Sequence, residues 1–449
     1  MNLAYDYYLD KINSARLIKQ YGVVSRVAGL MVESKGPAVP IGSLCNIETV
    51  DSEVSIPAEV VGFKESTIFL MPLGSLQGIN PGSIVTSTAQ RLSIPVGDHL
   101  LGRVLDGLGR PIDGKGPIIS CENRSLYAEP PGSMERKRIT EPLYTGIRAI
   151  DTLCTCGKGQ RMGVFSGSGV GKSVLMGMIA RGTCADVTII GLIGERSREV
   201  KEFIEQDLGP EGLKKSIVVA VTSDEPALIR LKGIMTATTI AEYYRDQGKD
   251  VMLLVDSMTR VAMAQREIGL AIGEPPATKG YPPSVFALLP KILERSGQGK
   301  EGSITGLYTV LVEGDDFNEP ISDAVRSILD GHIVLSRQLA AKNQYPAVDI
   351  LDSVSRLMLG VISPEHREAA GRIKETMAIY RENEDLINIG AYVQGRSEKI
   401  DQAIDCIDDI NRFLRQDIHE QGDPVEAIAI LPSLTEVEPT QTGKGDEKI

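Results

Sequence analysis

Several features that would assign a protein to other classes are absent from this 449-residue sequence. No apolar run approaches the roughly 18 residues that a membrane span requires, and the N-terminus lacks the charged-then-apolar pattern of a secretory leader. The six cysteines are scattered, unlike those of a secreted disulfide scaffold, and no second Cys/His pair accompanies Cys154 and Cys156 to form a zinc site. We therefore expect a cytoplasmic protein.

Positive charge is also scarce. The 48 lysines and arginines are outnumbered by 60 aspartates and glutamates, which gives a formal net charge of −12. Such a chain lacks the summed positive field that draws nucleic acid or anionic lipid to a protein surface. The composition therefore predicts no nucleic-acid partner, although it leaves room for a local basic patch.

Changes in residue pattern divide the chain into five parts. Residues 1–21 lack Gly and Pro and have apolar residues at helical spacing, which predicts an amphipathic helix. Residues 22–95 have short Val/Ile runs broken by Gly, Pro and Ser, typical of a small antiparallel β-barrel. Residues 96–365 begin with a glycine-rich linker and then alternate apolar strands with helices, which predicts a parallel α/β sheet. We expect a helical domain over 366–421 and a partly disordered tail over 422–449.

The α/β part contains a phosphate-binding motif. The run Ser166-Gly167-Ser168-Gly169-Val170-Gly171-Lys172-Ser173 follows an apolar strand and opens a helix, which is the setting of a P-loop. Glycines let backbone N–H groups approach phosphates, and the helix N-terminus adds positive charge. Lys172 is expected to reach the β- and γ-phosphates and Ser173 to ligate Mg²⁺. Ser166 departs from the pattern, because a glycine normally stands there.

Two acids follow other predicted strands. Asp256 ends the run VMLLVD, and Glu195 follows VTIIGLI, so both are expected at the carboxyl edge of the sheet. Asp256 suits a Walker-B carboxylate that holds magnesium through water, and Glu195 suits a base that polarises the attacking water. Arg196 and Arg260 bring positive charge to the same edge. Each of these residues alone could equally be an ordinary strand-end charge; together with the P-loop they predict an ATPase.

Long motifs then resemble a known family. GERSREV, DSMTRVAMAQREIGLAIGEPPATKGYPPSVFALLPKILERSG, EGDDFNEPISDAVRSILDGHIVLSRQLA and YPAVDILDSVSRLM are similar to segments of the flagellar and type III secretion export ATPases, which are homologues of the rotary ATP synthase catalytic subunit. The resemblance covers about residues 22–420. It implies an N-terminal β-barrel, a central RecA-like nucleotide domain and a C-terminal helical domain, assembled as a homohexameric ring that hydrolyses ATP.

The resemblance also implies roles for single residues. It gives Lys172, Ser173, Glu195 and Asp256 the roles stated above, and it matches Arg196 and Arg260 to arginines that approach the phosphates. Further matches are Arg356 to an arginine finger that enters a neighbour's site, Tyr345 to a tyrosine that stacks on adenine, and Phe413 to the first of two aromatics that close the adenine pocket. The second aromatic position is His419 here.

The same resemblance implies the partners and the location. The helix over 1–21 would bind a dimeric negative regulator, and the ring would meet export gate and stalk proteins and export chaperones with their cargo. The protein would be peripheral at the inner membrane, at the base of the export apparatus. Its ATP hydrolysis would help to release and unfold chaperone-bound substrates.

Alternative functions were weighed against the sequence. A non-catalytic ring subunit would lack the acid at Glu195. A RecA-type nucleic-acid translocase would need a basic, aromatic-rich barrel, whereas residues 22–95 contain only Phe63 and Phe69 as aromatics. The rotary synthase itself would need partner subunits, and EPPATKGYPPSVF and DDFNEP are closer to the export class. DGLGRPIDGKGP and FSGSGVGKSVLMGMIAR favour the flagellar branch over the equivalent ATPase of a virulence secretion system.

Overall fold

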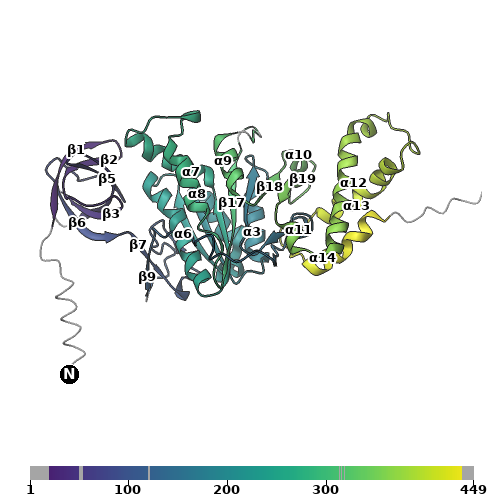
Figure 1. Ribbon diagram of the computed structural model, residues 1–449, viewed down its shortest axis with the longest axis horizontal. Coiled ribbons are helices and arrows are strands. Elements are labelled where there is room, and N and C mark those ends of the chain that lie inside the picture. Colours follow the sequence, from purple (N-terminus) through teal and green to yellow (C-terminus); the bar gives the residue numbers. More distant parts are fainter. Residues whose placement is uncertain are drawn as a thin grey trace, which may run out of the picture.

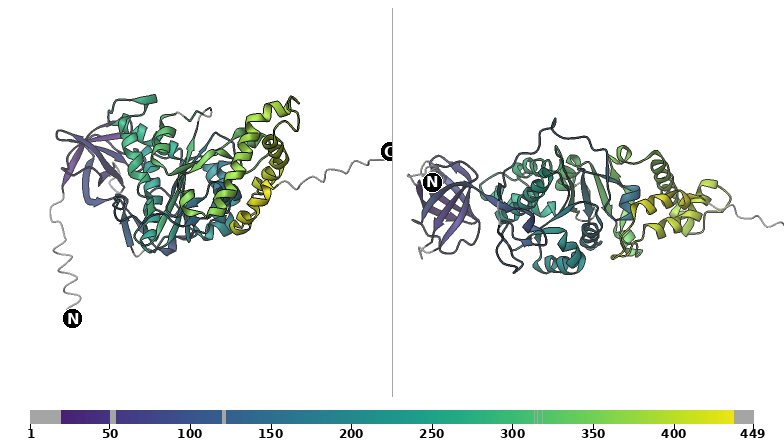
Figure 2. Two further views of the ribbon diagram at one scale, coloured as in Figure 1. Left: turned by 45° about the vertical axis from the view of Figure 1, so that its right-hand side comes forward. Right: turned by 90° about the horizontal axis from the view of Figure 1, so that it is seen from below.

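Three parts follow one another along the molecule in the computed structural model, which describes residues 20–436 except 50–53, 120–121, 313, 315 and 318. The barrel lies at one end, the α/β domain in the middle and the helical domain at the other end (Figure 1). Figure 2 shows the same order from two further sides. The helix predicted over 1–21 lies outside the described residues except at its end, where Tyr21 instead begins the first barrel strand.

The predicted barrel is confirmed. Six antiparallel strands close in the order β1-β2-β5-β4-β3-β6. Alternate residues of these strands point inward, where ten apolar side chains such as Ile47, Val60 and Leu70 form a small core of their own. The strands are β1 (Tyr21–Ala28), β2 (Met31–Lys35), β3 (Ser43–Glu48), β4 (Ser55–Lys64), β5 (Thr67–Pro72) and β6 (Ile84–Arg91).

The glycine-rich linker is more ordered than its sequence suggests. After β7 (Ser93–Val96), which pairs with β9 (Glu122–Ser125), the chain forms β8 (Val104–Leu105). β8 pairs in parallel with β14 (Ser216–Thr222) and is the outermost strand of the central sheet. The linker therefore joins the sheet instead of only connecting two domains.

The predicted parallel sheet is confirmed, with an order of β19-β18-β12-β17-β15-β13-β14-β8. All neighbours on this path are parallel except β18 and β19. Its remaining strands are β12 (Arg161–Ser166), β13 (Val187–Glu195), β15 (Asp250–Asp256), β17 (Ser303–Leu311), β18 (Gly331–Leu335) and β19 (Val348–Ser355). Two short elements complete this part: β16 (Gly297–Gln298), antiparallel to β17, and a ribbon of β10 (Pro142–Leu143) and β11 (Cys156–Gly157).

Helices cover both faces of the sheet, so its central strands β13, β14, β15 and β17 are buried along nearly their whole length instead of at alternate residues. Along β15, for example, Leu253 and Val255 belong to one core, whereas Met252 and Leu254 belong to the other. The first core includes α6 (Ala227–Asp246), α7 (Met258–Ala271), α8 (Pro283–Leu293) and α9 (Pro320–Ile328). The second includes α2 (Arg148–Leu153), α3 (Lys172–Gly182), α4 (Ser197–Glu202), a π-helical turn (Phe203–Leu208) and α11 (Met358–Val361). The short helices α5 (Gly209–Lys214) and α10 (Arg337–Ala341) complete the domain.

The C-terminal domain is helical, as predicted, but it continues beyond residue 421. After α12 (Pro364–Asn388) and α13 (Glu398–Leu414) the chain forms α14 (Pro424–Ile430) and a 3-10 turn (Leu431–Thr435). Leu431 is fully buried in the same core as α12 and α13. The ordered domain therefore takes in the first part of the predicted tail, while residues 437–449 lie outside the described residues. None of the helices in the described part has the length and apolar character to span a membrane.

A buried ion pair joins the barrel to the α/β domain. The Lys232 ammonium, on α6, lies 2.8 Å from a carboxylate oxygen of Glu59 on β4 and donates to the Tyr127 hydroxyl at 2.5 Å. Both charged residues are buried. Burial lowers the pKa of Lys232, whereas the Glu59 carboxylate opposes that shift. The carboxylate therefore compensates for a charge that water cannot reach.

Replacing Glu59 with alanine should destabilise the fold by about 3–5 kcal/mol, because it leaves the Lys232 charge buried without its partner. Equilibrium denaturation followed by circular dichroism measures the change. The matched control is Glu48→Ala, at an exposed glutamate of the same barrel, which should change stability by less than about 0.5 kcal/mol. Equal stabilities of the two variants would contradict a structural role for this pair.

Candidate active site

The P-loop has the backbone that its glycines predict. β12 ends at Ser166 and α3 begins at Lys172, and between them Gly169 and Gly171 adopt left-handed conformations with φ of 79° and 88°. Residues with side chains rarely adopt these angles. A Cβ atom at Gly167 would lie 2.6 Å from Nη2 of Arg337, so a side chain there would displace the end of that arginine. The glycines thus serve two different needs, backbone freedom and close packing.

The departure at Ser166 is explained by its position. Ser166 is the last residue of β12 and pairs with both Leu311 and Leu335 in the sheet. It is not among the residues with positive φ, so a side chain causes no backbone strain there. The turn of the loop starts only after it, and the P-loop assignment is unaffected.

The predicted lysine and acids meet at the carboxyl edge of the sheet. Nζ of Lys172 lies 2.5 Å from Oδ1 of Asp256 and 3.9 Å from Oε1 of Glu195. Asp256 also accepts a hydrogen bond from the Thr309 hydroxyl at 2.7 Å. Burial and the negative charge of Asp256 raise the pKa of Glu195 to about 7. Glu195 lines the cavity at this edge, and its Oε1 has no hydrogen-bond partner among the described residues, so a ligand or water that enters the cavity can bond to this carboxylate.

Positive charge surrounds the same cavity, whose volume is about 640 Å³. Its lining includes Lys172, Arg196 and Arg260, as predicted, and also Arg337 from α10, which the sequence analysis missed. Arg260 packs against Gly194, where a Cβ atom would lie 2.9 Å from that of Arg260. The cavity therefore has the charge that a polyphosphate requires.

The oxygen ligands present suit a magnesium ion. Ser173 lines the cavity, and the Asp256 carboxylate lies 2.5 Å from the Lys172 ammonium, which also lines it. Within the described residues no three His, Cys, Asp or Glu side chains cluster as a metal site. Such a sparse set is compatible with Mg²⁺, which keeps several waters and binds through one or two protein oxygens together with substrate phosphates.

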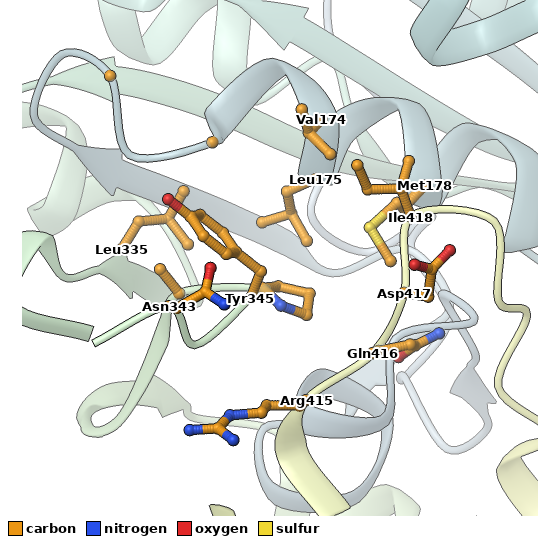
Figure 3. A pocket seen from close by; sticks show the side chains of 14 residues that line it. Val174, Leu175, Met178, Leu335, Asn343, Tyr345, Arg415, Gln416, Asp417 and Ile418 are labelled. Carbon is orange, nitrogen blue, oxygen red and sulfur yellow. The ribbon is translucent and has the colours of Figure 1, made fainter. Parts of the chain in front are cut away.

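A second, largely apolar cavity of about 590 Å³ adjoins the first (Figure 3). The two share Gly169, Gly171 and Val174, so the P-loop separates them. Tyr345 lies at this cavity, as predicted for a residue that stacks on adenine. The other labelled side chains are Val174, Leu175 and Met178 from α3, Leu335 from the end of β18, Asn343, and residues 415–418. An apolar cavity with few polar groups, next to a phosphate site, fits a nucleotide base.

Phe413 does not line this cavity. Its ring lies 5.9 Å from the Arg148 guanidinium and faces a different cavity near α14. Phe413 lies within α13, which continues to Leu414. From this part of the chain, only the residues after the helix, 415–418, line the apolar cavity. The side chain of Ile418 is there instead, and neither Phe413 nor His419 is among the lining residues. The motif match therefore assigned the adenine pocket to Phe413, five residues before Ile418, whose side chain lines the cavity.

Arg356 lies away from the P-loop of its own chain. β18 and β19 are antiparallel, and Ser355 pairs with Gly331 at the start of β18, whereas Ser166 pairs with Leu335 at its end. The two edges are roughly 13 Å apart along the strand. Arg356 is exposed, and in the described part of the chain no carboxylate lies within 4.0 Å of it. If Arg356 had a purely structural role, we would expect it to pair with a nearby acid such as Asp352. In the described structure Asp352 instead pairs with Arg381 at 3.5 Å.

Three family descriptions match the chain in the order of its domains. They are the ATP synthase alpha/beta family, beta-barrel domain (residues 24–89), the ATP synthase alpha/beta family, nucleotide-binding domain (146–355), and the T3SS EscN ATPase C-terminal domain (362–432). The last match separates the chain from rotary synthases in its helical domain and covers α12 to α14.

Individual proteins match over nearly the whole chain. The flagellum-specific ATP synthase of Bacillus subtilis is 56% identical over 95% of this chain and 98% of its own length, and the type 3 secretion system ATPase of Xanthomonas euvesicatoria is 49% identical over 93% and 95%. The structure of the assembled ATPase EscN from enteropathogenic E. coli has a TM-score of 0.86 and 45% identity, covering 92% of this chain and all of that one. This chain is therefore an ATPase of the ATP synthase alpha/beta family, in the group of flagellum-specific ATP synthases and type III secretion system ATPases.

Proposed function

We propose that this ATPase works in flagellar type III protein export, where it hydrolyses Mg·ATP in a homohexameric ring and helps to release and unfold chaperone-bound substrates. The observation that carries the proposal is the junction of a cationic cavity around Lys172 with an apolar cavity at Tyr345. The motifs DGLGRPIDGKGP and FSGSGVGKSVLMGMIAR favour the flagellar role, whereas flagellar relatives (46–56% identical) and type 3 secretion relatives (47–49% identical) overlap in their identity to this chain.

The P-loop would bind the phosphates of ATP. Backbone N–H groups of residues 167–171 would surround them, and Lys172 would contact the β- and γ-phosphates. Ser173 directly, and Asp256 through water, would hold Mg²⁺, which would neutralise charge on the β- and γ-phosphates. Because Nζ of Lys172 lies 2.5 Å from Oδ1 of Asp256, a bound phosphate would share that ammonium with the carboxylate.

Glu195 would act as the base for the attacking water. Its carboxylate lies beside Lys172, close to where a γ-phosphate would bind, and its raised pKa suits proton transfer near neutral pH. Arg196 and Arg260, at the mouth of the same cavity, would stabilise the negative charge on the transferred phosphoryl group.

A further positive charge, the guanidinium of Arg356, would come from a neighbouring subunit. Arg356 is exposed at the opposite edge of the sheet from its own P-loop, which is the arrangement expected of an arginine that serves the next subunit. Assembly of the similar ATPase EscN supports a ring for this chain. In well-studied phosphoryl transfer enzymes an arginine supplied in trans raises the rate by about 10³–10⁵.

Several partners belong to the same proposal. The ATPase EscN has been solved in complex with its central stalk EscO, which supports a stalk protein for this ring. A dimeric negative regulator would bind residues 1–21, and export chaperones with cargo would meet the ring at the export gate. With these partners the protein would be located at the cytoplasmic base of the apparatus, peripheral to the inner membrane.

Glu195→Gln should keep ATP affinity within about twofold and lower kcat by about 10²–10⁴, because it removes a base while keeping the shape. The pH profile supplies a second test. With the pKa of Glu195 raised to about 7, the active, deprotonated form is lost as the pH falls through 7. The wild-type kcat/KM should therefore fall about tenfold per pH unit below 7, and the variant should lack this inflection.

Glu202→Gln is the control for this variant, since Glu202 is half-buried on α4, outside the cavity, and pairs with Arg198. It should hydrolyse ATP at the wild-type rate with the wild-type pH profile. Turnover by Glu195→Gln at the wild-type rate would rule out the base role.

Arg356→Ala should bind ATP yet hydrolyse it slowly at every protein concentration, whereas the wild-type specific activity should rise with concentration as rings form. A mixture of inactive Arg356→Ala and Lys172→Ala proteins should regain activity, because the Lys172 variant can supply its arginine to an intact P-loop. Steady-state ATPase assays measure both effects, with exposed Arg372→Ala as the control. Full specific activity of isolated monomers would contradict the trans mechanism.

The export role can be tested in Bacillus subtilis that lacks its own flagellum-specific ATP synthase. Because 56% of the residues are identical over nearly the whole chain, expression of this chain should restore swimming at least in part. The Lys172→Ala variant should not. Failure of the wild-type chain to restore motility, together with rescue of a virulence secretion mutant, would favour the alternative role.

A further inference from the structure

Gln416, in the wall of the apolar cavity, connects three separate segments of the chain. Its side-chain oxygen accepts a hydrogen bond from the Arg148 backbone N–H at 2.9 Å, and its amide nitrogen donates to the carbonyl oxygens of Gly146 at 2.8 Å and Glu420 at 2.9 Å. Its own backbone N–H donates to the carbonyl of Tyr345 at 2.9 Å. The residue is only 5% exposed. Both amide hydrogens and the oxygen are therefore used in a buried site.

Arg148 makes further hydrogen bonds between the same segments. Its Nε donates to the carbonyl of Phe413 at 2.9 Å, and its terminal nitrogens bond to the carbonyl of Arg415 and to the carboxylate of Glu420. Residues 415–418, which we call the pocket strap, are thereby fixed to the start of α2 at both sides of Gln416. Because the strap forms one wall of the apolar cavity and Tyr345 another, Gln416 joins the two walls.

We infer that the Gln416 side chain is a positioning group for the base of the nucleotide: by fixing the pocket strap to residues 146–148, it holds in place the backbone N–H that bonds to Tyr345. The inference rests on the proposed binding of ATP at this site, and it concerns only the base half. The P-loop residues Lys172 and Ser173, which would bind the phosphates, are absent from the hydrogen bonds of Gln416. Loss of its amide should therefore weaken the binding of the base and spare that of the phosphates.

The chemistry of the amide makes the inference testable. The side chain faces two carbonyl oxygens and one N–H group, so it must both donate and accept. A glutamate of the same shape would bring a carboxylate against the carbonyls of Gly146 and Glu420 and donate to neither. Unpaired polar groups in a buried site are costly, which would displace the strap. Protonation of that glutamate would return one donor.

The experiment compares equilibrium binding of ATP and of inorganic tripolyphosphate to the full-length wild type, Gln416→Glu and Gln416→Met. Both variants should bind ATP about tenfold more weakly, equivalent to about 1.4 kcal/mol, while their affinity for tripolyphosphate stays within about twofold of the wild type. For Gln416→Glu alone, the ATP deficit relative to wild type should shrink as the pH is lowered from 8 to 6. Gln421→Glu, at an exposed glutamine just beyond the strap, carries the same charge change and should bind ATP as the wild type does.

The possible outcomes separate the two proposals. Wild-type affinity of both Gln416 variants for ATP would overturn the inference, as would an equal loss for ATP and tripolyphosphate, which would indicate a general structural defect. Thermal unfolding of each variant shows whether the fold persists, and the isosteric Gln416→Met keeps the test decisive if the charged variant does not fold. If the wild type itself bound tripolyphosphate as tightly as ATP, the base cavity and hence the proposed site would be wrong.

Discussion

The parallel register of the central sheet is the constraint on which the site depends. β12, β13 and β15 run in the same direction, so the chain leaves each of them at the same edge. The P-loop, Glu195 and Asp256 are therefore brought together by the direction of strand pairing, although they are far apart in sequence. The edge also collects backbone N–H groups and a helix N-terminus, which favour anions. If any one of these strands ran in the opposite direction, the P-loop or the acid at its end would lie at the opposite edge of the sheet.

Parts of the site that depend on local pattern could be predicted from the sequence. Lys172 and Ser173 follow from the P-loop run, and Asp256 and Glu195 follow from apolar runs that end in an acid. Their convergence needs only the rule that parallel strands end at one edge. The three-part fold was predictable for the same reason, since each domain has its own period of apolar residues.

Parts that depend on how long an element continues could not be predicted. Helix α13 runs to Leu414, and this places Ile418 at the base cavity and Phe413 outside it. Similarly, α14 forms in a stretch that was predicted to be tail. It is held there by the burial of Leu431 against the other helices, whereas the tail prediction rested on the polar and acidic residues that follow. Arg337 was missed because it reaches the cavity only through the folding of α10 against the P-loop, which brings together residues that are distant in sequence.

The buried Lys232–Glu59 pair has a consequence for how the molecule unfolds. A barrel of six short strands has a small core, and such a unit is only marginally stable by itself. Separating it from α6 would break the bonds of Lys232 to Glu59 and Tyr127 and would expose Met31 and Met71, barrel residues that belong to the same apolar core as α6. Local opening of the barrel is thereby tied to disruption of α6, the long helix packed on the sheet. We therefore expect the barrel and the α/β domain to unfold together, because part of the barrel's apolar surface is buried in the core of the α/β domain.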